Sequence, residues 1–294
     1  MRNIDLGALE IFKAVVEQGG ITKAATKLHR VQSNVTTRVK QLEDRLGTKL
    51  FLRQNRKLIL SPEGKLLLGY ADRLLHLSSE AEAVLRGGTP RGTLRLGTLE
   101  STAATRLPPI LSRYHLAYPE VRIDLVTGTE SALTAKVLNY EIEAAFVADP
   151  FTTTNLESQP AFIEELVLIA PKSFPKIRTP KDIGRRTIIA FSTGCSYRRR
   201  LEKWLGEAKV VPDRVMEFGS YHAIVACVAA GTGIAIVPRS VIRATLGEKD
   251  VTAYPLPADI SDAKTLLVWR RGHQSMALSA LQEELRRTKP KGST

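Results

Sequence analysis

The chain has 294 residues and carries 43 Lys and Arg residues against 30 Asp and Glu residues, so its formal net charge is +13. Its length is that of two ordinary domains, and a hydrophobic content of 43% excludes a largely disordered chain. The sequence lacks an uncharged apolar run of about 18 residues, and Asp5, Glu10 and Lys13 interrupt its N-terminus, so we expect no membrane span, no secretory signal and a cytoplasmic protein.

Positive charge is densest at the N-terminus, where residues 1–60 contain twelve basic and five acidic groups. Such density is typical of surfaces that bind nucleic acid or an acidic membrane, and it also occurs on ordinary solvated surfaces. Charge alone leaves these alternatives open, so the pattern of individual residues must decide between them.

Two short helices are predicted before residue 30. Apolar side chains at helical spacing from Leu6 to Val16 predict the first helix, which the pair Gly19-Gly20 ends. Thr22 can cap a second helix that runs to Leu28, and its small residues favour close helix packing.

A third helix is predicted over 32–46, where apolar residues recur at spacings of four and three and Gly47 ends the pattern. Its other face is polar and contains no acid before Glu43. Gln and Asn side chains pair with adenine, Arg with guanine, and Thr with bases or the thymine methyl group. The predicted DNA-binding residues of this face are Gln32, Ser33, Asn34, Thr36, Thr37, Arg38 and Lys40.

A hairpin is predicted to follow, with strands at 49–52 and 58–60 and a basic loop at 53–57. Basic side chains in that loop would contact phosphates, which hold a protein on DNA without reading sequence. Two helices joined by a turn, the second of them polar, form a helix-turn-helix, and the hairpin makes it winged. The alternative is a helical bundle with a polar surface. The predicted phosphate-binding residues are Arg53, Arg56 and Lys57.

A long helix is predicted between Pro62, which suits its first position, and the break at Gly87-Gly88, with Ser61 as its cap. At about 1.5 Å per residue it spans roughly 37 Å, too far to bury an apolar stripe on a small domain alone. We therefore expect it to pair with a second copy of the chain; the alternative is packing along the chain's own larger domain. The predicted dimerisation residues, at heptad spacing, are Leu67, Ala71, Leu74, Ser78, Ala81 and Leu85.

The rest of the chain, from about residue 91, alternates strand and helix patterns. This order predicts an α/β domain with a mostly parallel sheet, and its length suggests two subdomains with a cleft between them. Ligands of such sheets bind beyond the carboxyl ends of strands, near helix N-termini. Strands are expected at 93–97, 121–127, 143–148, 166–170, 187–191, 215–218, 234–237 and 266–269, and helices at 102–118, 131–140, 196–205, 221–230 and 275–287.

Two stretches of the sequence carry a family signature. The first consists of Ala24-Ala25, Leu28, Gln32-Ser33, Val39, Leu42-Glu43, Leu46-Gly47, Leu50-Phe51, Arg53 and Ser61-Pro62-Glu63-Gly64, and the second is residues 229–238. Both resemble the LysR-type transcriptional regulators, and the resemblance covers essentially the whole chain. Residues 31–38 and 194–198 are most similar to the subgroup typified by the regulators YofA and SoxR.

The resemblance implies a winged helix-turn-helix domain at 1–60, a linker and dimerisation helix at 61–90, and a periplasmic-binding-protein-like effector-binding domain at 91–294. Subdomain I would comprise about 91–163 and 268–294, and subdomain II about 164–267. It implies a regulator without enzyme activity, cofactor or metal, which forms a dimer or a homotetramer (a dimer of dimers) on double-stranded promoter DNA. A small-molecule effector would control it, and RNA polymerase is a further candidate partner.

Two positions depart from the family pattern. Val31 stands where many members have Ser or Thr, and a valine side chain cannot cap the third helix. Thr36 stands where Ser is more usual, but it keeps the hydroxyl and so the expected contact.

The resemblance places the effector between the subdomains. Ser101, Thr102 and Ser196 open predicted helices, whose free N–H groups attract a carboxylate. Arg198 could clamp that carboxylate, whereas Glu100 suits an ammonium group, so the set suggests an amino acid, an N-methylated amine or another small carboxylate. In the alternative, the hydroxyls only cap helices and Glu100 pairs with a neighbouring arginine. The predicted effector-binding residues are Thr98, Glu100, Ser101, Thr102, Thr127, Ala148, Cys195, Ser196, Tyr197, Arg198, Gly219 and Ser220.

Cys195 precedes a predicted helix and is followed closely by three consecutive arginines, which should favour its thiolate. A redox-responsive regulator is therefore an alternative function. Cys227 lies in an apolar helix pattern and is expected to be a small core residue. Two cysteines also exclude a disulfide framework and a cysteine zinc cluster.

An α/β enzyme and a solute-binding protein are the remaining alternatives. Gly231 and Gly233 precede a predicted strand instead of following one, so they are not a nucleotide-binding loop. The five histidines lack metal-ligand spacing, and His222 near Ser220 has no third orienting group for nucleophilic catalysis. A solute-binding protein would need an export signal and leaves the first 90 residues unexplained, so the sequence favours a regulator.

Overall fold

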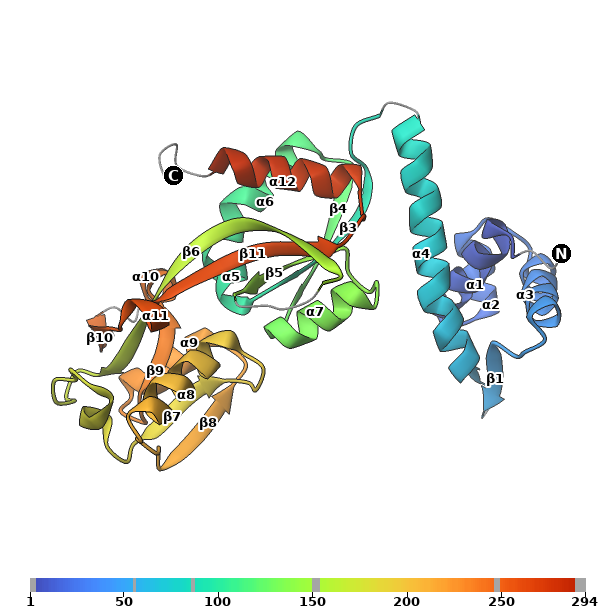
Figure 1. The fold of residues 1–294 in the computed structure, drawn as a ribbon. Helices are drawn as coiled ribbons and strands as arrows, with labels where there is room; N and C mark the ends of the chain where they lie inside the picture. The colour runs from blue at the N-terminus through green and yellow to red at the C-terminus, as the bar shows by residue number, and fades with distance from the viewer. Residues whose placement is uncertain (1–3, 55–56, 86–87, 150–153, 246–248, 289–294) are drawn as a thin grey trace. The chain divides into compact units, whose positions relative to one another are not determined.

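The computed structural model describes residues 4–54, 57–85, 88–149, 154–245 and 249–288 (Figure 1). Two compact units make up the chain, residues 1–88 and 89–294. The three predicted domains with boundaries at residues 60 and 90 stay a prediction, because the long helix after residue 60 belongs to the first unit. None of the helices in the described ranges is long and apolar enough to cross a membrane.

The N-terminal unit is the predicted winged helix-turn-helix with its long helix. Its elements are α1 (Leu6–Gln18), α2 (Ile21–Lys27), α3 (Gln32–Leu46), β1 (Phe51–Gln54), β2 (Lys57–Leu60) and α4 (Pro62–Leu85). Apolar residues of α1, α2 and α3 meet in one buried cluster, so the three short helices pack around each other. The remaining polar faces are left at the surface.

Local capping explains where these helices begin and end. The Asp5 side chain accepts a hydrogen bond from the Ala8 N–H (2.7 Å) and so starts α1. Gly19 and Gly47 adopt the left-handed conformation that ends α1 and α3, as predicted. The predicted cap at Thr22 is wrong: α2 begins one residue earlier, directly after the glycine pair, and has no side-chain cap.

The first strand of the wing lies two residues further along the chain than predicted, at 51–54 instead of 49–52. Antiparallel pairing runs from Phe51 opposite Leu60 to Gln54 opposite Lys57. The predicted loop at 53–57 is therefore wrong at both ends, because the antiparallel ladder continues to the pair formed by Gln54 and Lys57. Arg53 and Lys57 belong to the strands, while Arg56 lies outside the described residues.

Ser61 attaches the start of α4 to the segment before the wing. Its Oγ accepts a hydrogen bond from the Gly64 N–H (2.8 Å), which confirms the predicted cap, and donates one to the Lys49 carbonyl (2.7 Å). Gly64 lies against the backbone of Leu50, since a Cβ at position 64 would stand 2.3 Å from the Leu50 carbonyl oxygen.

The first turns of α4 are part of the unit's own core. Leu67 and Ala71, two of the six predicted dimerisation residues, are buried with Leu9, Phe12 and Leu50. These two predictions are corrected: a 24-residue helix can bury its N-terminal turns against α1 and still extend beyond it.

The C-terminal unit contains a seven-stranded sheet with the order β10-β6-β11-β5-β3-β4, and β9 also pairs with β6. The strands are β3 (Gly92–Thr98), β4 (Val121–Thr127), β5 (Ala144–Ala148), β6 (Leu156–Pro171), β9 (Ala235–Pro238), β10 (Val251–Pro255) and β11 (Asp262–Arg270).

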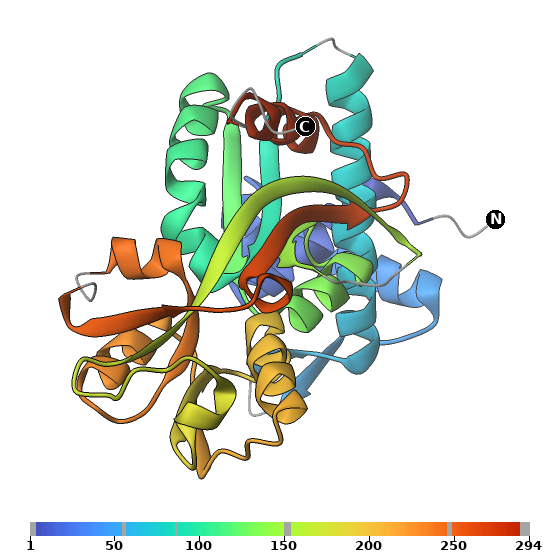
Figure 2. The same ribbon diagram turned by 60° about the vertical axis from the view of Figure 1, so that its left-hand side comes forward.

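A mostly parallel sheet was expected, and this expectation is wrong. Only the pairs of β3 with β4 and with β5 are parallel in that sheet. The other pairs are antiparallel, because β6 and β11 run beside each other in opposite directions through the unit (Figure 2). β6 pairs with β11 over 156–165 and with β9 and β10 over 166–171, so one strand joins the two halves of the unit.

Helices cover both faces of this sheet. α6 (Leu107–Ala117) and α12 (Met276–Thr288) share a buried cluster with Leu94 and Leu96 of β3, and α7 (Glu130–Leu138) packs into the cluster on the other face. In β5, Ala144 and Phe146 belong to the first cluster while Ala145 and Val147 belong to the second, as the two-residue period of a strand requires.

The predicted helix over 102–118 is two helices, α5 (Glu100–Thr105) and α6. The break falls at Arg106, just before Pro108 and Pro109, because proline suits the first turn of a new helix and not the interior of a continuing one.

The second half of the unit carries a small parallel sheet of β7 (Thr187–Phe191) and β8 (Arg214–Phe218). It is surrounded by α8 (Ser196–Glu207) and α9 (Tyr221–Ala229). The sequence did not predict β10 or the three short elements η1 (Pro180–Ile183), α10 (Arg239–Ala244) and α11 (Ala258–Ser261).

Two glycines of α4 provide a matched test of the packing at the wing. Gly64→Ala should destabilise the N-terminal unit by about 1–3 kcal/mol, because the new methyl group collides with Leu50 and Leu60. Gly69→Ala meets no atom within 4 Å and should stabilise the unit by up to about 1 kcal/mol through helix propensity. Urea denaturation followed by circular dichroism measures both, and two changes of equal sign would contradict the packing described.

Candidate functional site

The polar face of α3 is open to solvent. All seven predicted DNA-binding residues of α3 are exposed, whereas Val35, Val39 and Leu42 on the opposite face are buried against the rest of the unit. Thr36 Oγ1 donates a hydrogen bond to the Gln32 carbonyl (2.9 Å), which orients its methyl group. This surface is therefore available to a partner.

The start of α3 is uncapped by any side chain. Val31 is its N-cap residue, makes no side-chain hydrogen bond there, as predicted, and is 69% exposed. The backbone N–H groups of the first turn of a helix carry partial positive charge and suit an anion such as a phosphate.

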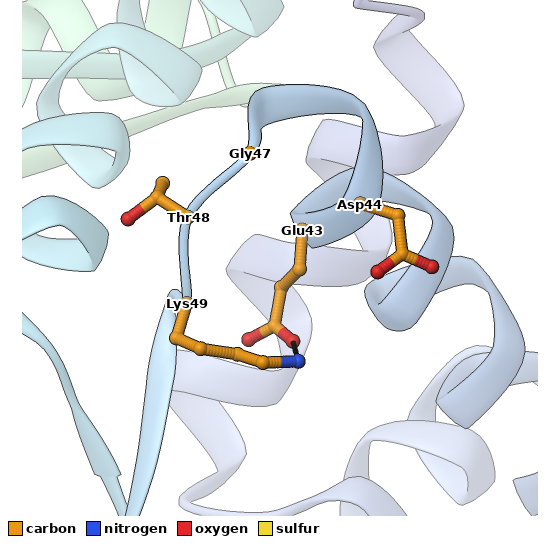
Figure 3. Close-up of a pocket in the computed structure, with 5 residues that line it drawn as sticks. All are labelled: Glu43, Asp44, Gly47, Thr48 and Lys49. Atoms are coloured by element: carbon orange, nitrogen blue, oxygen red, sulfur yellow. Dashed lines mark hydrogen bonds and ion pairs between the residues drawn. The ribbon is translucent and has the colours of Figure 1, made fainter.

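Glu43, at the last turn of α3, binds the segment that enters the wing. Its buried carboxylate accepts hydrogen bonds from the backbone N–H groups of Leu50 (2.9 Å) and Phe51 (3.2 Å) and from Lys49 Nζ (2.8 Å). Burial by itself raises the pKa of Glu43, but these hydrogen bonds outweigh it and hold the pKa below its ordinary value. Figure 3 shows the Lys49 side chain directed at Glu43, with Asp44 pointing away.

The hollow drawn in Figure 3 lies at this end of α3 and is lined by Glu43, Asp44, Gly47, Thr48 and Lys49. Its one buried acid is already bound by three donors, so the hollow is a by-product of the junction between helix and wing.

In the C-terminal unit, residues from both halves line one small pocket. Its cavity volume is about 10 Å³, which is room for about one water molecule, so the two halves close tightly on each other here. Four lining residues come from the half with β3 and five from the half with β7, and they are Leu99, Glu100, Gly128 and Thr129, with Phe191, Cys195, Ser196, Tyr197 and Tyr221.

The two halves also meet at contacts near this pocket. Arg199 Nη2 lies 2.6 Å from Glu130 Oε2, at the first turn of α7. Gly194 has a φ of +94°, and a Cβ at that position would stand 2.6 Å from Ser131 Oγ. A glycine is therefore needed there for the loop to approach α7 so closely.

Of the predicted effector-binding residues, four line the pocket: Glu100, Cys195, Ser196 and Tyr197. Ser101 and Thr102 are buried beside Glu100 in the first turn of α5. The other positions are not among its lining residues, and five that are lining residues were not predicted. Predicted residues that do not line the pocket include Thr98, Thr127, Ala148, Gly219 and Ser220. Lining residues outside the predicted set are Leu99, Gly128, Thr129, Phe191 and Tyr221.

Arg198 does not form the predicted carboxylate clamp. Its guanidinium is bound to Glu217, to Glu202 (2.7 Å) and to Thr193 Oγ1 (3.3 Å), away from the pocket lining. This correction follows from the helix: a side chain two positions after the first residue of α8 points to a different face from Ser196.

The arginines near Cys195 are all paired with acids or carbonyl groups. Beside the two pairs just described, Arg200 binds Asp149 (3.2 Å) and the carbonyl of Ile260 (3.2 Å). The uncompensated positive charge expected to favour a Cys195 thiolate is therefore missing there. Cys195 is 5% exposed and its Sγ lies 3.8 Å from the Tyr221 hydroxyl, while Cys227 packs on the apolar core as predicted.

Several polar atoms at this pocket are buried without a hydrogen-bond partner among the described residues. A buried polar group without a partner costs free energy, so a cluster of them marks a place for a polar ligand. These atoms are Glu100 Oε2, Thr102 Oγ1 and Ser196 Oγ, whereas the buried Tyr197 hydroxyl has the Ser101 and Thr265 hydroxyls as its hydrogen-bond partners.

Burial raises the pKa of three groups here. It raises the pKa of Glu100, against which the Tyr221 backbone N–H and His222 act in the opposite direction. It also raises the pKa values of Tyr197 and Tyr221 far above the ordinary value, so both phenols stay neutral donors. Within the described ranges, no group of three or more His, Cys, Asp or Glu side chains could hold a metal ion.

Comparison with known proteins gives two family matches that cover most of the chain. Residues 6–65 match the bacterial regulatory helix-turn-helix protein family of lysR type, and residues 87–290 match the LysR substrate binding domain. The chain is 43% identical to the uncharacterised HTH-type transcriptional regulator YusT of Bacillus subtilis over 280 residues, which cover 95% of this chain and 93% of YusT.

Two further relatives agree with these matches. HTH-type transcriptional regulator YofA of Bacillus velezensis is 39% identical over 283 residues, covering 96% of each chain. The crystal structure of full-length CbnR complexed with its target DNA has a TM-score of 0.68 at 22% identity and covers 97% of this chain and 100% of that one.

Replacing Glu43 tests the junction between α3 and the wing. Because its pKa is lowered in the folded chain, its charge contributes stability above the ordinary pKa of about 4.3, and this contribution is lost as pH falls through the lowered value. Glu43→Gln should lower the free energy of unfolding by about 1–3 kcal/mol at neutral pH, with a smaller difference from the parent near pH 4. Urea denaturation at several pH values measures this. Asp44→Asn, an exposed neighbour, is the control; equal effects of both changes, or a loss independent of pH, would contradict the assignment.

Proposed function

The chain belongs to the LysR family of bacterial transcriptional regulators, and from this membership we propose how its two units cooperate. It is a DNA-binding regulator with an effector-binding domain, and it is not an enzyme. In our proposal, a small molecule in the pocket between Glu100 and Tyr221 controls how two copies of α3 meet promoter DNA in the cytoplasm. The single observation that carries the DNA-binding half is the exposed polar face of α3, which has no acid before Glu43.

We place the exposed face of α3 in the major groove. Its Gln, Asn, Thr and Arg side chains have the donors and acceptors that read base edges, and Val31 beside them offers an apolar contact for a thymine methyl group. The uncapped first turn and the basic residues Arg53, Arg56 and Lys57 of the wing would bind phosphates on either side.

We propose that α4 pairs with α4 of a second copy. The helix exposes an apolar stripe that begins beside its buried first turns and includes Leu74 and Leu85 of the predicted seam. The stripe is displaced around the helix from Leu67 and Ala71, and its members are Leu66, Tyr70, Leu74, Leu77 and Leu85. A dimer, or a dimer of dimers, would present two copies of α3 to half-sites about one helical turn apart. RNA polymerase is the further partner that we propose for the assembly on a promoter.

For the effector we propose an amino acid or another small carboxylate. The support is the small pocket, with the unpartnered Ser196 Oγ at the N-terminus of the twelve-residue helix α8. Redox control through Cys195 has less support, since the thiol is buried and the nearby arginines are paired.

Substitutions on α3 should separate base reading from charge. Gln32→Ala should cost about 1–3 kcal/mol on the preferred operator and relax base preference at one position. Lys40→Met should weaken all DNA sequences alike and reduce the slope of affinity against salt by about 1. Fluorescence anisotropy on DNA selected from a random library, at two salt concentrations, measures both. Arg214→Gln on β8 is the control, and unchanged binding of all variants would contradict the proposed face.

Association through α4 is tested by a charge in the exposed stripe. Leu77→Glu should convert the assembly to smaller species without unfolding the chain, because the side chain is 61% exposed in a single copy. Sedimentation velocity gives the mass of the assembly. Leu116→Glu on α6, 79% exposed in the other unit, is the matched control. If Leu77→Glu sediments like the parent, α4 is not the contact.

A further inference from the structure

We propose that the effector carries a positively charged amino group and that the carboxylate of Glu100 is its counter-ion. This inference rests on the proposed function of the pocket and adds to it the charge of the ligand. In this proposal Glu100 is a residue that determines the specificity of the pocket for its ligand.

The charges around the pocket disfavour a plain carboxylate. Of the nine described residues that line it, Glu100 alone carries a formal charge at neutral pH. The arginines of α8 that could have neutralised an anion are engaged elsewhere: Arg198 by Glu217, Arg199 by Glu130 and Arg200 by Asp149. An anion in the pocket would therefore face a negative charge without a basic partner.

Only one of the two carboxylate oxygens of Glu100 has a hydrogen-bond partner among the described residues. One carboxylate oxygen accepts the backbone N–H of Tyr221, across the interface between the two halves, while Oε2 is buried and has no partner among the described residues. A buried charge is stable when it is paired and hydrogen-bonded, and is costly otherwise. An ammonium group offers both the opposite charge and N–H donors.

The remaining walls suit a cation as well. Three aromatic residues line the pocket with Glu100: the rings of Phe191 and Tyr221 are stacked with centroids 5.1 Å apart, and Tyr197 lies tilted to Tyr221 at 6.4 Å. Aromatic faces attract cations, and desolvated sites of this kind bind alkylated ammonium groups. Carboxylate and aromatic faces together define a cation-binding end of the pocket.

The other end of the pocket offers hydrogen-bond donors. Ser196 Oγ is buried at the start of α8 and has no partner among the described residues, and the buried Tyr197 hydroxyl, with Ser101 and Thr265 as its neighbours, lies on the same helix. Both phenols keep their protons, as burial requires. These donors suit the acceptor end of a ligand, so the polar groups of the pocket complement a small zwitterion with its amino group at Glu100, and the pocket must widen to admit it.

Matched ligand sets test this charge assignment on the full-length protein. Each set shares a carbon skeleton: an α-amino acid, the same acid without its amino group, and the same amine without its carboxyl group. The sets comprise the common small amino acids and the N-methylated glycines, tested by thermal shift and then by calorimetry up to about 10 mM. We expect at least one amino acid to bind at least about tenfold more tightly than its deaminated partner.

Variants then assign the effect to a residue. Glu100→Gln should weaken the amino acid at least about tenfold and bring the deaminated acid closer to it, because the carboxamide removes the charge and keeps the shape. Glu207→Gln, at the exposed end of the same domain's α8, should change neither. Unliganded melting temperatures identify any variant that fails to fold, and Glu100→Asp, which keeps the charge, should retain part of the binding.

The outcomes separate the two proposals. Equal binding of deaminated acids, no amino-bearing probe bound at 10 mM, or full binding by Glu100→Gln overturns the charge assignment. If Ser196→Ala still loses affinity in that case, the pocket remains the effector site and the proposed function stands. If neither Glu100→Gln nor Ser196→Ala affects a ligand that does bind, the pocket is not the effector site and both proposals fall.

Discussion

The buried carboxylate of Glu43 is the contact on which the geometry of the DNA-binding unit depends. It joins the end of α3 to the N–H groups of Leu50 and Phe51, and the same segment is held from the other side by Ser61, which donates to the Lys49 carbonyl. Three elements, α3, the wing and α4, are therefore connected through three residues of backbone. A change in the direction of α4 would displace the wing and α3 as well. The reason is that hydrogen bonds and the close approach of Gly64 to Leu50 hold the three elements tightly together.

The C-terminal unit follows the same rule for buried charge and departs from it at one place. Glu164, 2% exposed on β6, accepts two hydrogen bonds from Arg106 and one from Ser240 (2.8 Å), so elements from both halves are fastened to the connecting strand. Close to this network, Glu100 Oε2 and the hydroxyls of Thr102 and Ser196 are buried without a partner among the described residues. Because these groups come from both halves, a ligand bound to them, as proposed above, would join the two halves at this point.

How far prediction succeeded depended on whether the determinants were local. The limits of α3, Gln32–Leu46, were predicted because apolar spacing and Gly47 lie within the helix itself. The break in the helix predicted over 102–118 was also signalled locally, by Pro108 and Pro109, and was missed. By contrast, the pairing of β6 with β11 joins segments about a hundred residues apart, and nothing in either segment states the direction of its partner.

The sequence by itself determined the family, the order of elements and the exposed polar face of α3, because each is recorded in neighbouring residues and in side-chain period. Only the tertiary structure decided which residues share a site. It turned Arg198 away to Glu217, buried Leu67 and Ala71 in the unit's own core, and brought Phe191 and Tyr221 to Glu100. The reason is that the partners of a charge or of an apolar face depend on packing between segments that are distant along the chain. The local spacing of residues does not determine that packing.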